Sequence, residues 1–283
     1  MDEGKIQNGF EIRNSRISIR LSLRPIESLR PHEEIVPHEL GLIVHDLERE
    51  NSLRHPIIAD TSSGVILDGT HRLAPLKVLE CNQVPCALVE YDDPRIIVER
   101  WYRIITGSSL DEFVEELGGE TQTVPTNEEA EKCLTLRECY ASISDGKSWL
   151  TLPCNLTTPL ELIRAAYKIE EFAKQKGFKI KYSDTNKPVL SSDRLVLSTI
   201  ALNKPEIVKS ALSGEVFPPK TTRHIIPSRP LATSTPLELL RSKHTREAQA
   251  LFVQGLQSRQ VKKMPEGSKI GSRRYMEEVF VFT

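Results

Sequence analysis

Two short polar runs in this chain contain the residue types that chemistry on a phosphate group needs. The first run, at positions 68–72, reads Asp-Gly-Thr-His-Arg and directly follows the apolar positions 65–67. The apolar positions predict a buried strand, and the helical spacing of leucines after position 72 predicts a helix. A strand-loop-helix corner points backbone N–H groups outward, which suits an anion such as phosphate. Asp68 could hold a metal or orient a substrate there; a tight turn capped by Asp68 is the competing interpretation.

The second run, at positions 216–224, reads Val-Phe-Pro-Pro-Lys-Thr-Thr-Arg-His and contains no acidic residue. Its two prolines stiffen the approach. The five residues that follow offer an ammonium, two hydroxyls, a guanidinium and an imidazole, all of which can donate to phosphate. Lys and Arg also lie side by side on ordinary solvated faces, but a run anchored by two prolines favours an anion cradle over a solvated helix.

Taken together, the two runs make the chain resemble the free L-serine kinases built on the ParB/sulfiredoxin-type fold, which convert L-serine and a nucleotide into O-phosphoserine. The resemblance rests on four segments in the family's order, at positions 30–33 (Arg-Pro-His-Glu), 68–72, 101–102 (Trp-Tyr) and 217–224. They cover roughly residues 20–235, and four collinear segments are far more specific than any one of them.

The resemblance implies a role for each candidate residue. Serine phosphorylation needs a base near the hydroxyl, a metal at the phosphates and cationic donors around the transferred group. Glu33 would be the catalytic base, rather than its neighbour Glu34, and Asp68 would organise Mg²⁺ and the substrate hydroxyl. Trp101 would wall the serine pocket, although a place in the core explains this aromatic nearly as well. The residues that would bind substrate and phosphate are Gly69, Thr70, His71, Arg72, Lys220, Thr221, Thr222, Arg223 and His224.

One position departs from the family, whose best-known members carry a second histidine where this chain has Thr70. A threonine can donate a hydrogen bond but cannot become cationic. The phosphoryl donor stays open between ATP and ADP, because relatives divide between the two and the chain has no readable adenine-specific motif. A Walker-type glycine loop is absent and is not expected in this family.

Three alternatives compete with the kinase interpretation. A DNA-binding partition-type protein of the same N-terminal fold would need a basic surface and a helix-turn-helix after the corner, where this chain shows strand patterns. A sulfiredoxin would need a nucleophilic cysteine inside the corner, where Thr70 stands instead. A ParB-like nucleotide-binding regulator without kinase activity is compatible with the same residues.

The composition is that of an ordinary globular protein. Of 283 residues, 39% are hydrophobic and 27% charged, and the formal net charge of -1 disfavours a nucleic-acid partner. From position 241 onward nine Lys and Arg stand against four Glu, which indicates a basic C-terminal extension. Five cysteines without a CxxC pair indicate neither a disulfide framework nor a zinc site. Because the N-terminus lacks a signal peptide and no apolar run approaches the ~18 residues of a membrane span, we expect a cytoplasmic protein without a membrane partner.

The elements that must position these residues predict an α+β chain of two domains. Residues 1–93 would form a ParB/sulfiredoxin-like domain, and residues 94–283 an α/β domain carrying the second run and the extension, with the active site in the cleft between them. Residues 1–14 are expected to be frayed. Strands are predicted at 17–23, 55–59, 65–67, 84–89, 96–105, 195–200 and 278–282, a hairpin at 140–152, and helices from Pro37, from Thr70 with Pro75 inside it, at 110–117, from Pro159 to Gly177, at 205–212 and at 236–256.

Overall fold

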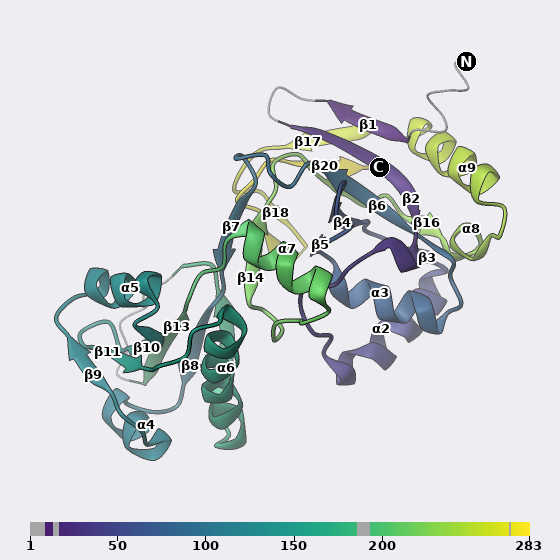
Figure 1. The fold of residues 1–283 in the computed structure, drawn as a ribbon. Helices are drawn as coiled ribbons and strands as arrows, with labels where there is room; N and C mark the ends of the chain where they lie inside the picture. Colours follow the sequence, from purple (N-terminus) through teal and green to yellow (C-terminus); the bar gives the residue numbers. More distant parts are fainter. Residues whose placement is uncertain (1–8, 14–16, 186–192, 272) are drawn as a thin grey trace. The chain divides into compact units, whose positions relative to one another are not determined.

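The computed structural model describes residues 9–13, 17–185, 193–271 and 273–283, which form two compact units (Figure 1). Unit 1 comprises Met1–Ile97, Ile207–Glu215 and His224–Thr283, and unit 2 comprises Val98–Glu206 and Val216–Arg223. The first boundary thus falls at Ile97 rather than at residue 93. The expected second domain, residues 94–283, differs more from unit 2, because most of the residues after 206 lie in unit 1.

Among the described residues, unit 1 is built on a five-stranded sheet in the order β1-β2-β6-β4-β5. The strands are β1 (Phe10–Arg13), β2 (Ser18–Pro25), β4 (Ile57–Asp60), β5 (Ile66–Asp68) and β6 (Gln83–Val89). β4 and β6 are parallel and the other neighbours are antiparallel. Every residue of β6 is buried, as its position inside the sheet requires. The expectation of a frayed N-terminus is wrong for β1, which pairs with β2 over its whole length.

Two helices flank this sheet, α2 (Pro37–Glu50) and α3 (Thr70–Val78), and they pack against each other. Both begin where the sequence predicts, with Pro37 in the first turn of α2 and Pro75 inside α3. The helical spacing of Leu40, Ile43, Val44 and Leu47 predicts an apolar stripe on α2, which is only partly a core face. Leu47 is buried, whereas the other members of the stripe are half-buried. A short 3-10 helix, η1 (Ile26–Ser28), precedes α2.

The C-terminal residues complete unit 1 instead of extending unit 2. The predicted helix at 236–256 is two helices, because Asn82 and Gln83 bind the carbonyls of Arg241 and Ser242 and hold the chain in a bend there. The second helix packs on β2, where the Gln249 side chain accepts a hydrogen bond from the backbone N–H of Leu23. The elements are α8 (Leu237–Arg241), α9 (Thr245–Gln257), a sheet of β15 (Arg229–Leu231), β20 (Val279–Phe282) and β17 (Val261–Met264), and the pairs β16 (Thr235–Pro236) with β3 (Ser52–Leu53) and β18 (Lys269–Ile270) with β19 (Arg273–Arg274).

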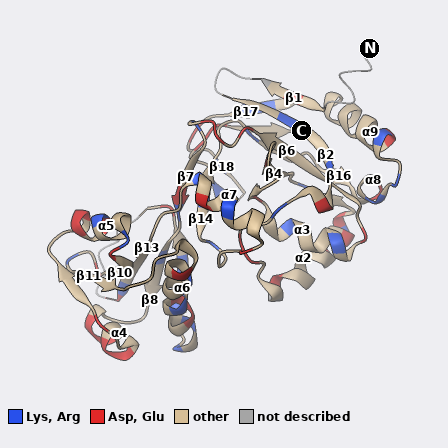
Figure 2. Cartoon of the chain, viewed as in Figure 1, with Lys and Arg blue, Asp and Glu red and all other residues tan. Residues whose placement is uncertain are grey.

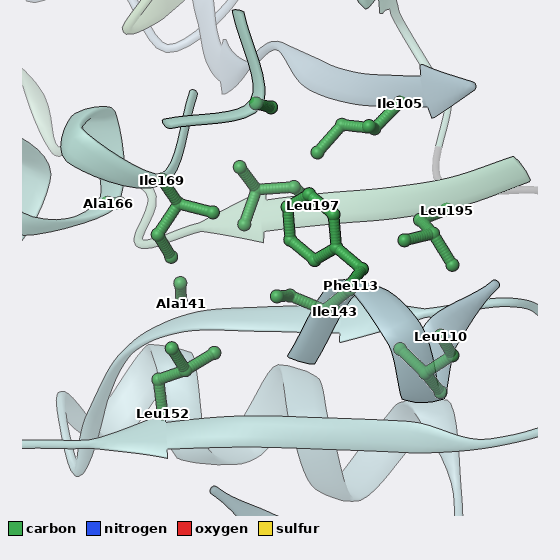
Figure 3. Packing of buried hydrophobic residues seen from close by; sticks show 11 residues of the cluster. Ile105, Leu110, Phe113, Ala141, Ile143, Leu152, Ala166, Ile169, Leu195 and Leu197 are labelled. Atoms are coloured by element: carbon green, nitrogen blue, oxygen red, sulfur yellow. The ribbon is translucent and has the colours of Figure 1, made fainter. Parts of the chain in front are cut away.

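The described part of unit 2 contains a six-stranded antiparallel sheet in the order β12-β8-β13-β10-β11-β9. Phe113 from α4 inserts among Ile143 and Leu197 of neighbouring strands (Figure 3). The predicted strand at 96–105 is interrupted at Trp101. The elements are β8 (Tyr102–Thr106), β9 (Gln122–Val124), β10 (Cys139–Ser144), β11 (Trp149–Pro153), β12 (Lys179–Ser183), β13 (Arg194–Thr199), α4 (Leu110–Leu117), α5 (Asn127–Leu136) and α6 (Pro159–Gln175), with α7 (Lys204–Ser213) and the pair β7 (Ile97–Arg100) and β14 (Thr222–Ile225) at the unit boundaries.

Charges of both signs are interspersed along α5, α6 and α9, whereas the charged residues of α4 are all acidic (Figure 2). Within the described ranges, no helix combines the length and the apolar character needed to cross a membrane. The mixed α/β architecture agrees with the predicted fold class at this level.

Candidate functional site

The corner predicted at positions 68–72 joins β5 to α3. Asp68 ends the strand, and Gly69 is the N-cap of α3 with φ of 97°, a conformation that favours glycine. A Cβ atom on Gly69 would also lie 2.5 Å from Nη1 of Arg72, which folds back and donates a 2.7 Å hydrogen bond to the carbonyl of Pro56. Gly69 therefore allows the close approach of Arg72, while the N-terminus of α3 lies directly behind Asp68. Of the next two residues, Thr70 is buried and His71 half-buried.

Three guanidinium groups surround the Asp68 carboxylate. Nη1 of Arg229 lies 2.9 Å from Oδ2, Nη1 of Arg72 lies 3.9 Å from the same oxygen, and Nη1 of Arg273 lies 3.9 Å from Oδ1. Burial by itself would raise the pKa of Asp68, but the charges of Arg229, Arg72 and Arg273 outweigh it and hold this pKa well below its ordinary value. Asp68 is therefore ionised at neutral pH.

These surroundings fit a metal ligand poorly. A divalent cation on Asp68 would lie among three guanidinium charges, which repel it. The described part of the chain also holds no group of three or more His, Cys, Asp or Glu side chains that could bind a metal ion. The expectation that Asp68 ligates Mg²⁺ directly is therefore not favoured by the geometry, and no resident metal is needed to explain the contacts of Asp68.

Glu33 lies on a segment that runs beside β5. The backbone of Arg30 bonds to Gly64 and to Ile66, both at 2.9 Å, and Nδ1 of His32 donates a 2.6 Å hydrogen bond to the carbonyl of Ile66. His32 is buried, and this burial lowers its pKa despite the nearby Glu33 carboxylate, so the ring is neutral at pH 7. Oε1 of Glu33 lies 3.8 Å from Nε2 of His32. His32, the chain neighbour of Glu33, is thus held at Ile66, two residues before Asp68.

His224 belongs to the same unit. Its Nε2 lies 2.8 Å from the hydroxyl of Tyr91, and its ring packs edge-on against that of His32 with centroids 5.6 Å apart. Unit 1 thus brings together three of the predicted segments, namely the one that carries Glu33, the corner and the last residue of the second run.

The other predicted residues lie in unit 2 around Trp101. Nζ of Lys220 lies 5.8 Å and Cζ of Arg223 lies 5.2 Å from the centroid of the Trp101 ring. Arg223 is buried and pairs with two carboxylates, 3.3 Å from Glu99 and 3.1 Å from Asp184, whereas Lys220 is exposed. The charge of Arg223 is therefore already compensated by two carboxylates, and it is less exposed than the side chain of Lys220.

The two threonines of the second run have different surroundings from Lys220. Both Thr221 and Thr222 are buried, and the hydroxyl of Thr221 donates a 2.7 Å hydrogen bond to the carbonyl of Pro218. This bond closes a turn in which Lys220 has a positive φ of 61°. The run is thus an ordered turn that presents the Lys220 side chain.

Sequence reasoning missed the partners that hold these residues. The residue patterns single out none of Tyr91, Arg229 and Glu277. The sequence carries one signal for Arg229, which is an arginine inside the otherwise mainly apolar segment 225–231. Nothing in the sequence indicates that Arg229 pairs with Asp68 and Glu277, because both carboxylates are far away along the chain.

Comparisons with known proteins agree with the family suggested by the four segments. No protein-family model matches the chain. The ATP-dependent L-serine kinase of Staphylothermus marinus is 30% identical over 221 residues, which cover 70% of this chain and 82% of that protein. The ADP-dependent L-serine kinase SerK of Thermococcus kodakarensis is 28% identical over 62% of this chain and 73% of its own. A ParB-like protein of Sulfolobus acidocaldarius is 27% identical over 63% of this chain and 77% of its own.

Solved structures show the same fold. SbnI of Staphylococcus aureus with a C-terminal truncation superposes with a TM-score of 0.67 at 21% identity, over 84% of this chain and 95% of that chain. A free serine kinase with a Glu-to-Ala mutation, in complex with ADP, superposes with a TM-score of 0.65 at 24% identity, over 78% of this chain and 93% of that one. With the first relative matched over most of its length, the chain belongs to the family of the L-serine kinases.

Proposed function

We infer that this protein is a free L-serine kinase, which transfers a phosphoryl group from a nucleotide to the hydroxyl of L-serine and forms O-phospho-L-serine. The observation that carries this conclusion is the 30% identity over 82% of an ATP-dependent L-serine kinase. The four matching segments support it. The donor is a nucleoside tri- or diphosphate, since the relatives include an ATP-dependent and an ADP-dependent enzyme.

We propose that Glu33 and Asp68 do the proton chemistry and the orientation. Glu33 would take the proton of the serine hydroxyl as its oxygen attacks the terminal phosphorus and the bond to the leaving nucleotide breaks. Asp68 would orient the same hydroxyl through Oδ1, since the described residues place a hydrogen-bond donor only on Oδ2. The low pKa of Asp68 suits an orienting acceptor better than a base, which leaves the base role to Glu33.

The phosphates would be bound by two groups of residues. In unit 1 these are Gly69, Thr70, His71 and Arg72 at the N-terminus of α3, where backbone N–H groups favour an anion, together with His224. In unit 2 they are Lys220, Thr221, Thr222 and Arg223, with Trp101 beside them as a wall of the serine pocket.

Mg²⁺ is proposed to enter with the nucleotide, held by its phosphates. Magnesium in phosphotransferases is commonly bound by one or two carboxylates and by substrate phosphates rather than by a complete protein cage. When bound, it neutralises charge on the phosphates. No step of the proposed chemistry depends on a protein-bound metal.

The similarity to a ParB-like protein supports a second candidate function, that of a nucleotide-binding regulator without kinase activity. The two are separated by incubating the purified protein with L-serine, Mg²⁺ and either ATP or ADP, and following the amino acid by mass spectrometry. O-phosphoserine with either nucleotide supports the kinase. Nucleotide binding without phosphoserine, with both donors, would replace the kinase by the regulator.

L-threonine is the matched comparison substrate. Its additional methyl group in a pocket shaped for serine is expected to cost about 1–3 kcal/mol in kcat/KM. Equal rates on serine and threonine would contradict a close-fitting serine pocket.

A further inference from the structure

Arg229 is a charged side chain with only 1% of its surface exposed. Each of the three nitrogens of its guanidinium donates a hydrogen bond. Nε donates to Oε1 of Glu277 at 2.7 Å, Nη1 to Oδ2 of Asp68 at 2.9 Å, and Nη2 to the backbone carbonyl of His224 at 2.9 Å. One buried group therefore connects two residues of the proposed site to the C-terminal segment. The resemblance to the kinases assigns no role to this arginine.

The two carboxylates explain how the charge tolerates burial. An isolated buried guanidinium is costly, and it persists in a protein interior only when it is paired and its hydrogen bonds are made. Glu277 is itself buried, 5% exposed, and supplies the second negative charge. Glu277 accepts the hydrogen bond from Nε and shares the positive charge of Arg229. Arg229 therefore donates to Oδ2 of Asp68 alone, and Oδ1 can accept a hydrogen bond from a ligand.

The same C-terminal segment approaches Asp68 a second time. Arg273 lies 3.9 Å from Oδ1 of Asp68, and its Cζ lies 4.8 Å from the centroid of the Tyr275 ring. These residues line a small pocket with Asp68, Arg229 and Arg72. Arg273 is part-exposed, in contrast to Arg229, so the segment supplies one buried and one accessible cation beside the same carboxylate.

We propose that Arg229, held in place by Glu277, is the positioning residue of Asp68, so that residues 273–277 work as part of the active site. The proposal rests on the proposed function as far as turnover is concerned. Its structural content is that Asp68 and Glu277 are coupled through one guanidinium, which also fixes the backbone of His224.

The turnover test uses Arg229→Ala in the full-length protein, after thermal unfolding has verified that the variant folds. We expect kcat to fall about 100-fold because Asp68 is displaced. Added guanidinium should restore part of kcat, whereas urea, its neutral isostere, at the same low concentration should not. A folded Arg229→Ala variant with the wild-type kcat overturns the proposal.

The matched control is Glu278→Gln. Glu278 is the chain neighbour of Glu277, is also buried, and pairs with Lys263 at 2.6 Å instead of with Arg229. We expect Glu277→Gln to lower kcat and Glu278→Gln to leave it unchanged. Equal losses in the two variants would assign the effect to general packing of the C-terminal segment and overturn the proposal.

A second measurement is independent of activity. A double-mutant cycle compares the unfolding equilibrium constants of Asp68→Asn, Glu277→Gln and the double variant. The effect of the double variant on this constant should differ about fivefold or more from the product of the two single effects, because only the double variant leaves Arg229 without a carboxylate. Additive effects overturn the coupling even if the enzyme is active. Absence of phosphoserine from the wild type, with the coupling present, would reject the kinase function alone.

Discussion

The ion pair between Arg103 and Glu170 anchors the sheet of unit 2 to α6, and its removal is expected to destabilise this unit strongly. Glu170 is completely buried and Arg103 is 3% exposed. Nε of Arg103 donates to Oε2 of Glu170 at 2.9 Å, while Oε1 accepts from Lys174 at 2.6 Å and from the hydroxyl of Tyr182 at 2.5 Å. Both carboxylate oxygens are thus in use.

Glu170→Gln keeps the shape of the side chain but has one acceptor oxygen instead of two. In either orientation its amide NH₂ faces a donor, so either Arg103 or the pair Lys174 and Tyr182 loses its acceptor. Breaking one partner of a buried ion pair typically costs about 3–5 kcal/mol. For a domain of this size such a loss lowers the midpoint of thermal unfolding by roughly 10–20 °C.

Urea denaturation followed by tryptophan fluorescence measures this effect in the right place, because both tryptophans of the chain, Trp101 and Trp149, lie in unit 2. The control is Lys174→Met, which removes a half-exposed partner and should cost less than about 1 kcal/mol. Replacing Arg103 and Glu170 together by Met should be milder than Glu170→Met alone, since no charge is left unpaired. A Glu170→Gln variant within about 1 kcal/mol of the wild type would refute this reasoning.

Three further predictions follow from the site. Glu33→Gln should lower turnover by about 10²- to 10⁴-fold with nucleotide affinity retained, and Glu34→Gln should stay active; the opposite pattern would move the base to Glu34. Lys220→Ala should weaken nucleotide binding by about 1.5–3 kcal/mol in a calorimetric titration without lowering the unfolding midpoint, because Lys220 is exposed; unchanged affinity would remove it from the phosphate site. Burial, with the charges of Arg72 and Arg54, lowers the pKa of His55 from 6.5 to about 4. Between pH 4 and pH 6.5 the His55 side chain therefore binds a proton more readily in the unfolded chain than in the folded one. Stability should therefore be complete above pH 6.5 and fall by about 2 kcal/mol as the pH drops toward 4, after allowance for partial exposure, and a His55→Gln variant should lack this part of the pH dependence.

The elements that the sequence predicts well are those whose apolar pattern matches their burial. β2 alternates between buried and accessible residues, and α6 buries one stripe from Leu162 to Ala173. β12 escaped prediction because none of its residues is buried, and it joins the sheet by backbone pairing with β8. The expectation of fraying over residues 1–14 was wrong for β1, which is held by backbone pairing with β2 at the edge of the sheet and buries Ile12; residues 1–8 and 14 lie outside the described residues.

The division into domains was harder to predict, because it depends on contacts between segments that are far apart in the sequence. The C-terminal residues pack with the N-terminal ones in unit 1. The expected boundary near residue 93 follows a local turn signal. Nothing local indicates that β20 would pair in parallel with β15, or that α9 would pack on β2. Those contacts bring the basic C-terminal residues into unit 1, where two of them, Arg259 and Arg273, contact the backbone at 232–234 and the Asp68 carboxylate.

Residue types alone do not predict which cations of the site are paired, because the carboxylates that pair with buried arginines come from distant segments. The second polar run contains no acidic residue, which favoured an anion cradle, yet the fold brings Glu99 and Asp184 to Arg223 and brings Asp68 and Glu277 to Arg229. A buried arginine needs such partners, so each of the two guanidiniums is held by a pair of carboxylates from distant segments. A phosphate at Arg223 must therefore compete with two carboxylates in a buried position, whereas the side chain of Lys220 is exposed. Residue type alone assigns both side chains to phosphate, and only the three-dimensional structure separates the exposed Lys220 from the buried Arg223.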